Sequence, residues 1–184
     1  MADGSAALRP ARDVLSSVPH RAAAALAGRT LQWGSPRRRT ALADNERLAQ
    51  LKAHANACPY YRLIGFEVVE ADQGRAVLKM PVREELLQFQ DAVHGGAIFS
   101  VADAAIAVAL LTLAEPNEHA LTVECKLNFL AGVTRAHRYV LAEGRIIHKG
   151  RTIAVGEVDV SRDDGRLAAK GLVTYALRPA RAPA

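Results

Sequence analysis

One apolar stretch with a single carboxylate constrains the fold of this chain more than any other feature. Residues 94–114 read HGGAIFSVADAAIAVALLTLA, and Asp103 is their only carboxylate. The stretch lacks alternation, is rich in Ala and Leu, and is followed by Glu115-Pro116-Asn117, so we predict a helix over about residues 96–113. A helix that is apolar on nearly every side is buried in a protein core or in a membrane. Asp103 therefore either caps a backbone donor inside the fold or has a functional role, because an unpaired buried carboxylate is costly.

The predicted helix opens with His94-Gly95-Gly96. Glycine lets a substrate approach the backbone closely. The first N–H groups of a helix lack internal partners and favour negative charge, so an oxyanion developing from a carbonyl group would be stabilised there. Asp103 lies roughly two turns further along, at about 1.5 Å per residue. One helix does not comfortably deliver both groups to the same atom, so a second subunit would supply the carboxylate at a dimer interface.

The charge distribution argues against a nucleic-acid partner. The net charge is +5, but seven of the 24 basic residues and two of the 19 acidic residues lie in residues 1–43, which leaves 17 of each in the remainder. The body of the chain therefore has no basic footprint, and 5% aromatic residues offer little surface for stacking on bases.

Cysteine content and the placement of Asp103 bear on metals and membranes. Two cysteines, Cys58 and Cys125, make no disulfide framework, and the histidines show no metal spacing. We expect free, at least half-buried thiols in a reducing compartment, no metal and no cofactor. Residues 97–114 are long enough to span a membrane. Asp103 near their middle and the amphipathic strands that follow favour a core helix in a soluble protein, with no membrane partner.

Residues 1–43 differ in composition from the rest and are predicted to form a basic, disordered arm, with a disordered tail at residues 179–184. No secretory signal is visible, so we expect a cytoplasmic protein. Arg enrichment in the arm is also typical of mitochondrial transit peptides, which would place the protein in the matrix, although Asp3 and Asp13 argue against this.

Between the arm and the tail, residues 44–178 are predicted to form one α+β domain. Asp44 is expected to cap a helix over residues 45–56 that ends at Cys58-Pro59. Alternating residues around Gln73-Gly74 predict a hairpin. Four further strands follow the long helix, and an antiparallel sheet curled around that helix is the packing solution. The predicted strands lie at residues 64–72, 75–82, 120–130, 138–149, 152–162 and 167–177.

The run LLQFQDAVHGGAIFSVAD resembles the hotdog-fold acyl-CoA thioesterases, in particular the phenylacetyl-CoA thioesterase-like (PaaI-type) family. The resemblance covers about residues 59–177. It rests on the His-Gly-Gly turn, the spacing from His94 to Asp103, and Gln88 six residues before the histidine. It implies the hotdog fold and hydrolysis of acyl-CoA thioesters with an aryl or medium-chain acyl group. It also implies a homodimer or homotetramer formed by strand-edge pairing, which agrees with the exposed edges that a curled sheet leaves.

The resemblance also implies roles for residues near the helix start. The N–H of Gly95 would hydrogen-bond the thioester oxygen, and Gly96 would lie against the substrate. Asp103 of the other subunit would attack the carbonyl carbon or activate a water. Gln88 would donate its amide to the carbonyl or to water, or is simply an exposed loop amide. His94 either orients the turn, contacts the thioester sulfur, or is bonded to backbone near the helix start.

Residues away from the helix start are expected to complete the site. Thr122 would position water near the carboxylate, or is only a good strand residue. Glu124, two residues on, would share the face of Thr122 and shape the site, or is a solvent-facing carboxylate at the sheet edge. Phe89 would alter the acyl pocket. The turn Lys149-Gly150-Arg151-Thr152 offers cations, N–H groups and a hydroxyl to coenzyme A phosphates, or is a surface turn.

Two other functions compete with hydrolysis. A non-catalytic acyl-CoA-binding module would keep the glycines and the cations but has no need for a buried acid. A hotdog hydratase or dehydratase acting on enoyl or hydroxyacyl thioesters pairs its Asp and His in a different motif. Asp103 inside the helix that follows His-Gly-Gly favours the thioesterase.

Overall fold

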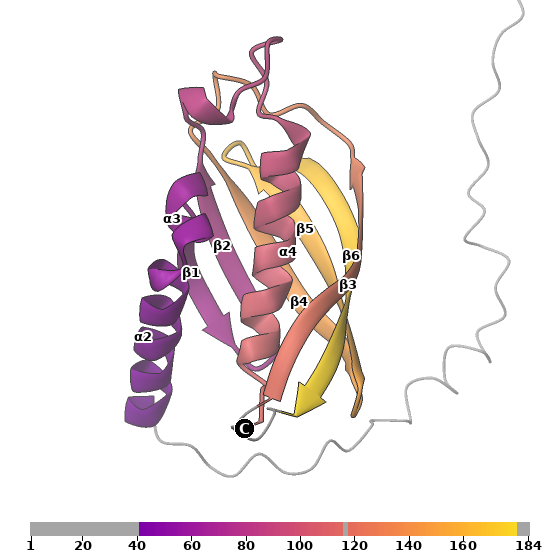
Figure 1. The fold of residues 1–184 in the computed structure, drawn as a ribbon. Coiled ribbons are helices and arrows are strands. Elements are labelled where there is room, and N and C mark those ends of the chain that lie inside the picture. The colour runs from indigo at the N-terminus through magenta and orange to yellow at the C-terminus, as the bar shows by residue number, and fades with distance from the viewer. Residues whose placement is uncertain (1–40, 116–117, 180–184) are drawn as a thin grey trace, which may run out of the picture. The chain divides into compact units, whose positions relative to one another are not determined.

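A computed structural model describes residues 41–115 and 118–179 of the 184-residue chain (Figure 1). Ordered along the sequence, the described elements are α2 (Ala41–Ala57), α3 (Pro59–Ile64), β1 (Glu67–Asp72), β2 (Arg75–Pro81), the 3-10 turn η2 (Glu84–Leu86), α4 (Gly95–Leu111), β3 (Glu118–Phe129), β4 (Tyr139–Lys149), β5 (Ile153–Arg162) and β6 (Leu167–Pro179).

Most of the predicted elements are confirmed with small shifts at their ends. The long helix and the six strands occur in the predicted order, β-β-α-β-β-β-β, as an α+β arrangement. Two local predictions are wrong. Helix α2 begins at Ala41, so Asp44 lies in its first turn rather than capping it. The chain after Cys58 forms a second helix, α3, with Pro59 at its start, before it enters β1. The predicted arm and tail lie almost wholly outside the described residues and stay predictions.

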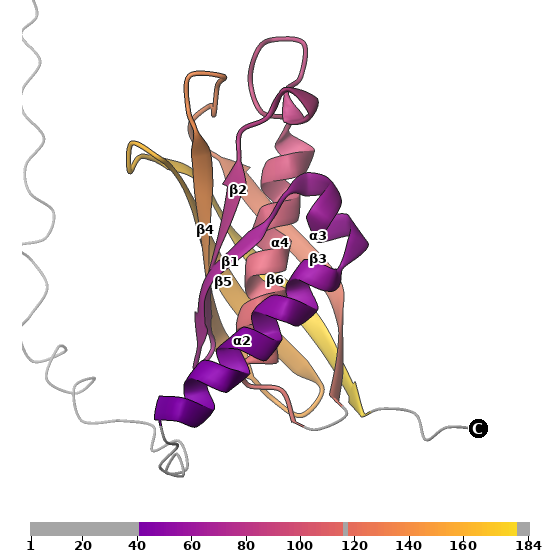
Figure 2. The same ribbon diagram turned by 90° about the vertical axis from the view of Figure 1, so that its left-hand side faces the viewer.

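The six strands form one antiparallel sheet in the order β1-β2-β4-β5-β6-β3. Helix α4 lies against one face of this sheet and packs mainly on β2, β4 and β5. Helices α2 and α3 lie beside β1, as the second view shows (Figure 2). The two sheet edges are therefore β1, next to α2, and β3.

The Ala-rich composition of α4 lets it approach the sheet closely. Most of its residues are buried, among them Val101, Ala105 and Ile106 at 0% exposure. Gly144 of β4 lies directly beneath the helix, where a Cβ atom would come within 2.8 Å of the backbone of Ala105. Small residues on both sides of this contact explain why a helix that is apolar on nearly every side fits between the sheet and the rest of the core.

A side chain ties down the C-terminal end of α4; Pro116 and Asn117 of the predicted stop lie outside the described residues. The hydroxyl of Thr112, the C-cap residue, donates to the carbonyl of Ala109 at 2.7 Å and accepts from the N–H of Gly74 at 2.6 Å. These bonds tie the end of the helix to the β1–β2 turn. In the described part of the chain no helix has the length and apolar content needed to cross a bilayer.

Candidate active site

Asp103 lies on the side of α4 that faces β3 and β6, and two hydroxyl groups hold its carboxylate. The phenol of Tyr175 on β6 donates to Oδ1 at 2.6 Å, and the Thr122 hydroxyl on β3 donates to the same oxygen at 3.2 Å. Thr122 and Tyr175 are cross-strand partners, so the sheet register places both donors on one side of the carboxylate. No hydrogen bond from a described residue reaches Oδ2.

The groups around Asp103 are neutral at physiological pH. Burial, together with the nearby charge of Asp103, holds the pKa of the Tyr175 phenol well above its usual value. Burial, with smaller contributions from Cys58 and Asp103, raises the pKa of Tyr61 to about 12. Burial is also the main reason that the pKa of the Cys125 thiol is raised to about 11, followed by the charges of Asp103 and Glu124. The carboxylate is therefore surrounded by protonated donors and an uncharged thiol.

The start of α4 presents a free backbone donor. His94 is the N-cap residue, and its Nδ1 accepts from the N–H of Gly96 at 2.9 Å. This bond fits both a structural histidine at the helix start and one that orients the glycine turn. The N–H of Gly95 donates a hydrogen bond to none of the described residues. Gly95 is also the residue at which the resemblance places the oxyanion.

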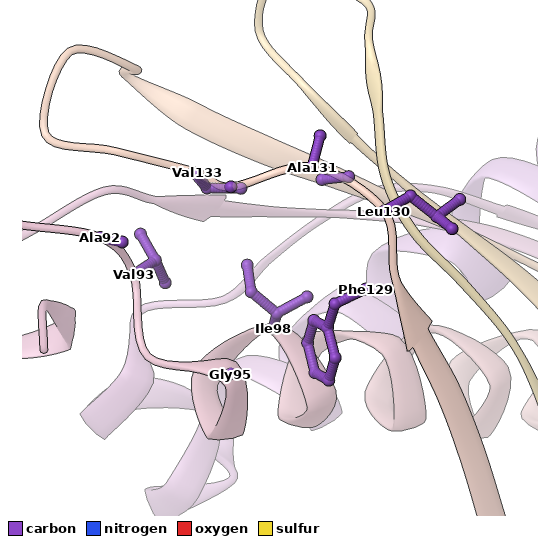
Figure 3. Close-up of a pocket in the computed structure, with 10 residues that line it drawn as sticks. Ala92, Val93, Gly95, Ile98, Phe129, Leu130, Ala131 and Val133 are labelled. Atoms are coloured by element: carbon purple, nitrogen blue, oxygen red, sulfur yellow. The ribbon is translucent and has the colours of Figure 1, made fainter. Parts of the chain in front are cut away.

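An apolar cavity of about 380 Å³ opens beside Gly95 (Figure 3). Ile98 and Phe129 project into the space between the helix start and the loop that follows β3. Its lining carries no charged side chain; the residues are Ala92, Val93, Gly95, Ile98, Phe129, Leu130, Ala131, Gly132, Val133 and Ala168. The Phe129 ring lies so close that a Cβ atom at Gly95 would be 3.3 Å from its Cζ. This space suits an apolar group better than a charged one.

The two parts of the candidate site do not meet within one chain. Eight residues separate Gly95 from Asp103, which is about 12 Å along a helix axis. Both parts do lie along the same edge strand, because Phe129 at the end of β3 contacts Gly95 and Thr122 near its beginning contacts Asp103.

Other predicted site residues lie apart from these groups. The Gln88 side chain is engaged inside its own loop, donating to Gln90 at 3.3 Å. Phe89 at the tip of that loop is 96% exposed and is not part of the cavity lining. Asp91 in this loop has a positive φ, and its carboxylate forms an ion pair with Arg135 at 3.1 Å. This pairing argues against Asp91 as a second reactive carboxylate.

The Lys149-Gly150-Arg151-Thr152 turn lies at the opposite end of α4 from His94. Its neighbours are the C-terminal residues of β6, since Thr152 accepts a backbone hydrogen bond from Leu177. Lys149 forms an ion pair with Glu118 at 3.0 Å, and its side chain is only 16% exposed. Within one chain this turn therefore does not approach the Gly95 cavity.

Sequence reasoning missed one member of the site and misplaced another. The residues predicted from the sequence do not include Tyr175. A signal was present, because Tyr175 lies on the same face of its strand as the buried residues Val173 and Leu177, and a buried phenol needs a hydrogen-bond partner. Glu124 does not share the face of Thr122, because a bulge at Val123 shifts the register and pairs Glu124 with Thr174. The prediction from simple alternation was wrong at this point.

Comparisons with known proteins agree with this geometry. A family model described as the thioesterase superfamily matches residues 90–169. A putative esterase of Saccharolobus solfataricus is 32% identical over 115 residues, covering 62% of this chain and 80% of the relative. The acyl-coenzyme A thioesterase PaaI of Escherichia coli is 29% identical over 116 residues, covering 59% and 76%. The structure of a conserved protein from Pseudomonas aeruginosa superposes with a TM-score of 0.63 at 30% identity, covering 68% and 98%.

An antiparallel sheet against one long helix that opens with a glycine turn defines a hotdog-fold protein. The chain belongs to the thioesterase superfamily, is PaaI-like, and is a thioester hydrolase. The fold and the enzyme class expected from the sequence are therefore confirmed. A binding module and a hydratase are disfavoured, because these relatives are named as hydrolases of esters or thioesters.

Proposed function

We propose that the protein hydrolyses acyl-CoA thioesters with an aryl or medium-chain acyl group, at sites shared between two copies of the chain. The observation that carries this proposal is the division of the site along β3. Gly95 and its apolar cavity lie at one end of the strand, and Asp103 lies near the other; neither the Gly95 N–H nor Asp103 Oδ2 has a hydrogen-bond partner among the described residues.

Pairing of β3 with β3 of a second copy would bring the two parts together. In an antiparallel pair about a two-fold axis near the middle of β3, the Thr122 end of one strand lies beside the Phe129 end of the other. The Gly95 cavity then approaches Asp103 of the partner subunit, and two equivalent sites form. This supports a homodimer as the functional unit, with a tetramer as a pair of such dimers.

The chemistry follows from the groups at each end. The N–H of Gly95 and the positive end of the helix dipole would polarise the thioester carbonyl and stabilise its developing negative charge. Asp103 of the partner subunit either attacks the carbonyl carbon with Oδ2 or removes a proton from the attacking water. Both routes break the C–S bond, and the thiolate of coenzyme A leaves and takes up a proton. After direct attack by Asp103, water must also hydrolyse the mixed anhydride to release the free acid. His94 would hold the glycine turn, Gln88 would donate to the carbonyl or the water, and Thr122 would align the carboxylate and the water.

The surroundings support the assignment of the substrate. The apolar cavity beside Gly95 suits an aryl or aliphatic acyl group, and Phe129, not the exposed Phe89, is the aromatic side chain that limits it. A partner that runs antiparallel would present its Lys149-Gly150-Arg151-Thr152 turn near this end of the helix, where Arg151 is available to a coenzyme A phosphate. The E. coli relative, named an acyl-coenzyme A thioesterase, supports the choice of thiol.

The test is release of free thiol from a panel of acyl-CoAs by the wild type, Asp103→Asn and Asp72→Asn. Asn keeps the size of the side chain but lacks the charge needed for attack or proton abstraction, so Asp103→Asn should lower kcat by about 10²–10⁴-fold. Asp72, an exposed carboxylate on β1, is the matched control and should leave turnover unchanged. Wild-type turnover by Asp103→Asn would contradict the mechanism, and the panel gives the acyl preference in the same experiment.

A further inference from the structure

We infer that Tyr175 is a positioning residue that fixes the orientation of the reactive carboxylate. The inference deepens the proposed function, since it rests on Asp103 as the reactive group. The Tyr175 side chain is 3% exposed, and its phenol donates to Oδ1 of Asp103 at 2.6 Å. The same hydroxyl lies 3.0 Å from the backbone carbonyl oxygen of Asp103, so it contacts the residue at two points.

The pattern of hydrogen bonds divides the carboxylate into a held oxygen and a free one. Tyr175 and Thr122 both donate to Oδ1, and no donor among the described residues reaches Oδ2. The terminal torsion of an Asp side chain is broad and nearly two-fold, so an unheld carboxylate would turn readily. Two donors on one oxygen remove this freedom and leave Oδ2 as the oxygen available for attack or for proton abstraction. A reactive group that is oriented in advance saves part of the barrier.

The backbone sets this arrangement before any substrate arrives. Thr122 and Tyr175 are register partners on the neighbouring strands β3 and β6, so their hydroxyls reach the same oxygen from one side. The bulge at Val123 follows immediately and turns Glu124 to the other face, which keeps a second carboxylate away from Asp103. Tyr175 stays protonated near neutral pH, because burial and the charge of Asp103 raise its pKa, so it remains a donor while the enzyme works.

Tyr175→Phe tests the inference, because it keeps the buried ring and removes only the hydroxyl. We expect kcat to fall about ten- to a hundred-fold, with KM within two-fold of the wild type and the thermal midpoint lowered by a few degrees, because a hydrogen bond to a carboxylate is lost. The control is Tyr139→Phe on β4, a half-buried tyrosine whose hydroxyl bonds no described residue; it should retain wild-type kcat. A hydroxyl that only stabilised the fold would lower the midpoint in Tyr175→Phe and leave kcat unchanged.

Asp103→Asn, measured in parallel, separates the two proposals. If Asp103→Asn is inactive and Tyr175→Phe keeps wild-type kcat, the role of Tyr175 is overturned and the proposed function stands. If Asp103→Asn turns over normally, the proposed function fails and the role of Tyr175 fails with it. Should Tyr175→Phe not fold, Thr122→Val provides a second test, because it removes the other donor to Oδ1 and Thr122 is exposed. A wild-type kcat in Thr122→Val would contradict the inference that donors on Oδ1 orient the carboxylate.

Discussion

The two edges of the sheet are built in opposite ways. β1 is six residues long, carries a bulge at Val69, exposes Glu67, Glu70 and Asp72, and lies against α2. Short length, bulges, charges and a covering element are the usual protections against pairing with another chain. The β1 edge is thus completed by the chain itself.

The β3 edge also has a bulge, and it exposes the charges of Glu124 and Lys126, but it is long and no described element covers it. It is 12 residues long, and its exposed residues include Leu121 and Val123, each 63% exposed, and Phe129. A long edge with exposed apolar side chains indicates pairing with another strand. Both parts of the candidate site lie beside this edge and none beside β1. Under the proposed function, assembly and catalysis would both depend on β3, so a change at β3 should affect both and a matching change at β1 should affect neither.

The largest expected effect comes from a lysine at the β3 bulge. In Val123→Lys, a charge at the edge opposes pairing with a second copy. We predict a monomer by light scattering and a loss of turnover of at least about a hundred-fold, because each site would lack the partner's carboxylate. Val69→Lys is the matched control, since Val69 is the bulge residue of β1 and is 38% exposed. Equal effects of the two lysines, or an active Val123→Lys dimer, would remove the distinction between the edges.

The elements on which this comparison depends could be predicted from the sequence, because their signals are local. Unbroken apolar character marked α4, and alternation between glycine turns marked the strands within a few residues. Helix α3 was missed because its six residues, which begin at Pro59, are too few for a helical period to show. The start of α2 was misjudged because Asp44 has the right residue type for a cap, but the helix continues through it.

The site was predictable only in its local parts. Asp103 stands out as the one carboxylate of an apolar helix, and Thr122 followed from the resemblance; the structure brings these two together. Tyr175 lies 72 residues from Asp103, and only the β3–β6 register connects them. One extra residue, Val123, reverses the side on which Glu124 lies. The ion pair of Lys149 with Glu118 likewise depends on a contact between distant segments.

A smaller effect is expected from Gly95→Ala, which changes the site beside Phe129, the last residue of β3. The added Cβ would lie 3.3 Å from the Phe129 ring, so the ring or the helix start must shift by a few tenths of an ångström. We predict a fall in kcat/KM of about ten-fold, since misplaced donors lose catalytic effect, with the oligomeric state unchanged. Gly95→Ala combined with Phe129→Leu should recover part of the activity. A dimer that dissociates on Gly95→Ala would show that the site and the edge are not separable.

The smallest expected effect concerns Cys125, which lies near the middle of β3 on the side that faces α4. Its pKa of about 11, raised by burial and then by the charges of Asp103 and Glu124, leaves less thiolate than an ordinary cysteine has at pH 8. The thiolate fraction falls on the order of a hundred-fold, and the greater nucleophilicity of a more basic thiolate recovers about ten-fold. In a Cys58→Ser background we therefore predict iodoacetamide alkylation about ten-fold slower than for free cysteine.

Adding Asp103→Asn should raise the alkylation rate only a few-fold, because burial, the larger cause of the raised pKa, remains. Adding Val123→Lys instead leaves the charge of Asp103 in place and exposes the edge. A faster reaction in that variant alone would mean that pairing along β3, rather than the carboxylate, protects the thiol.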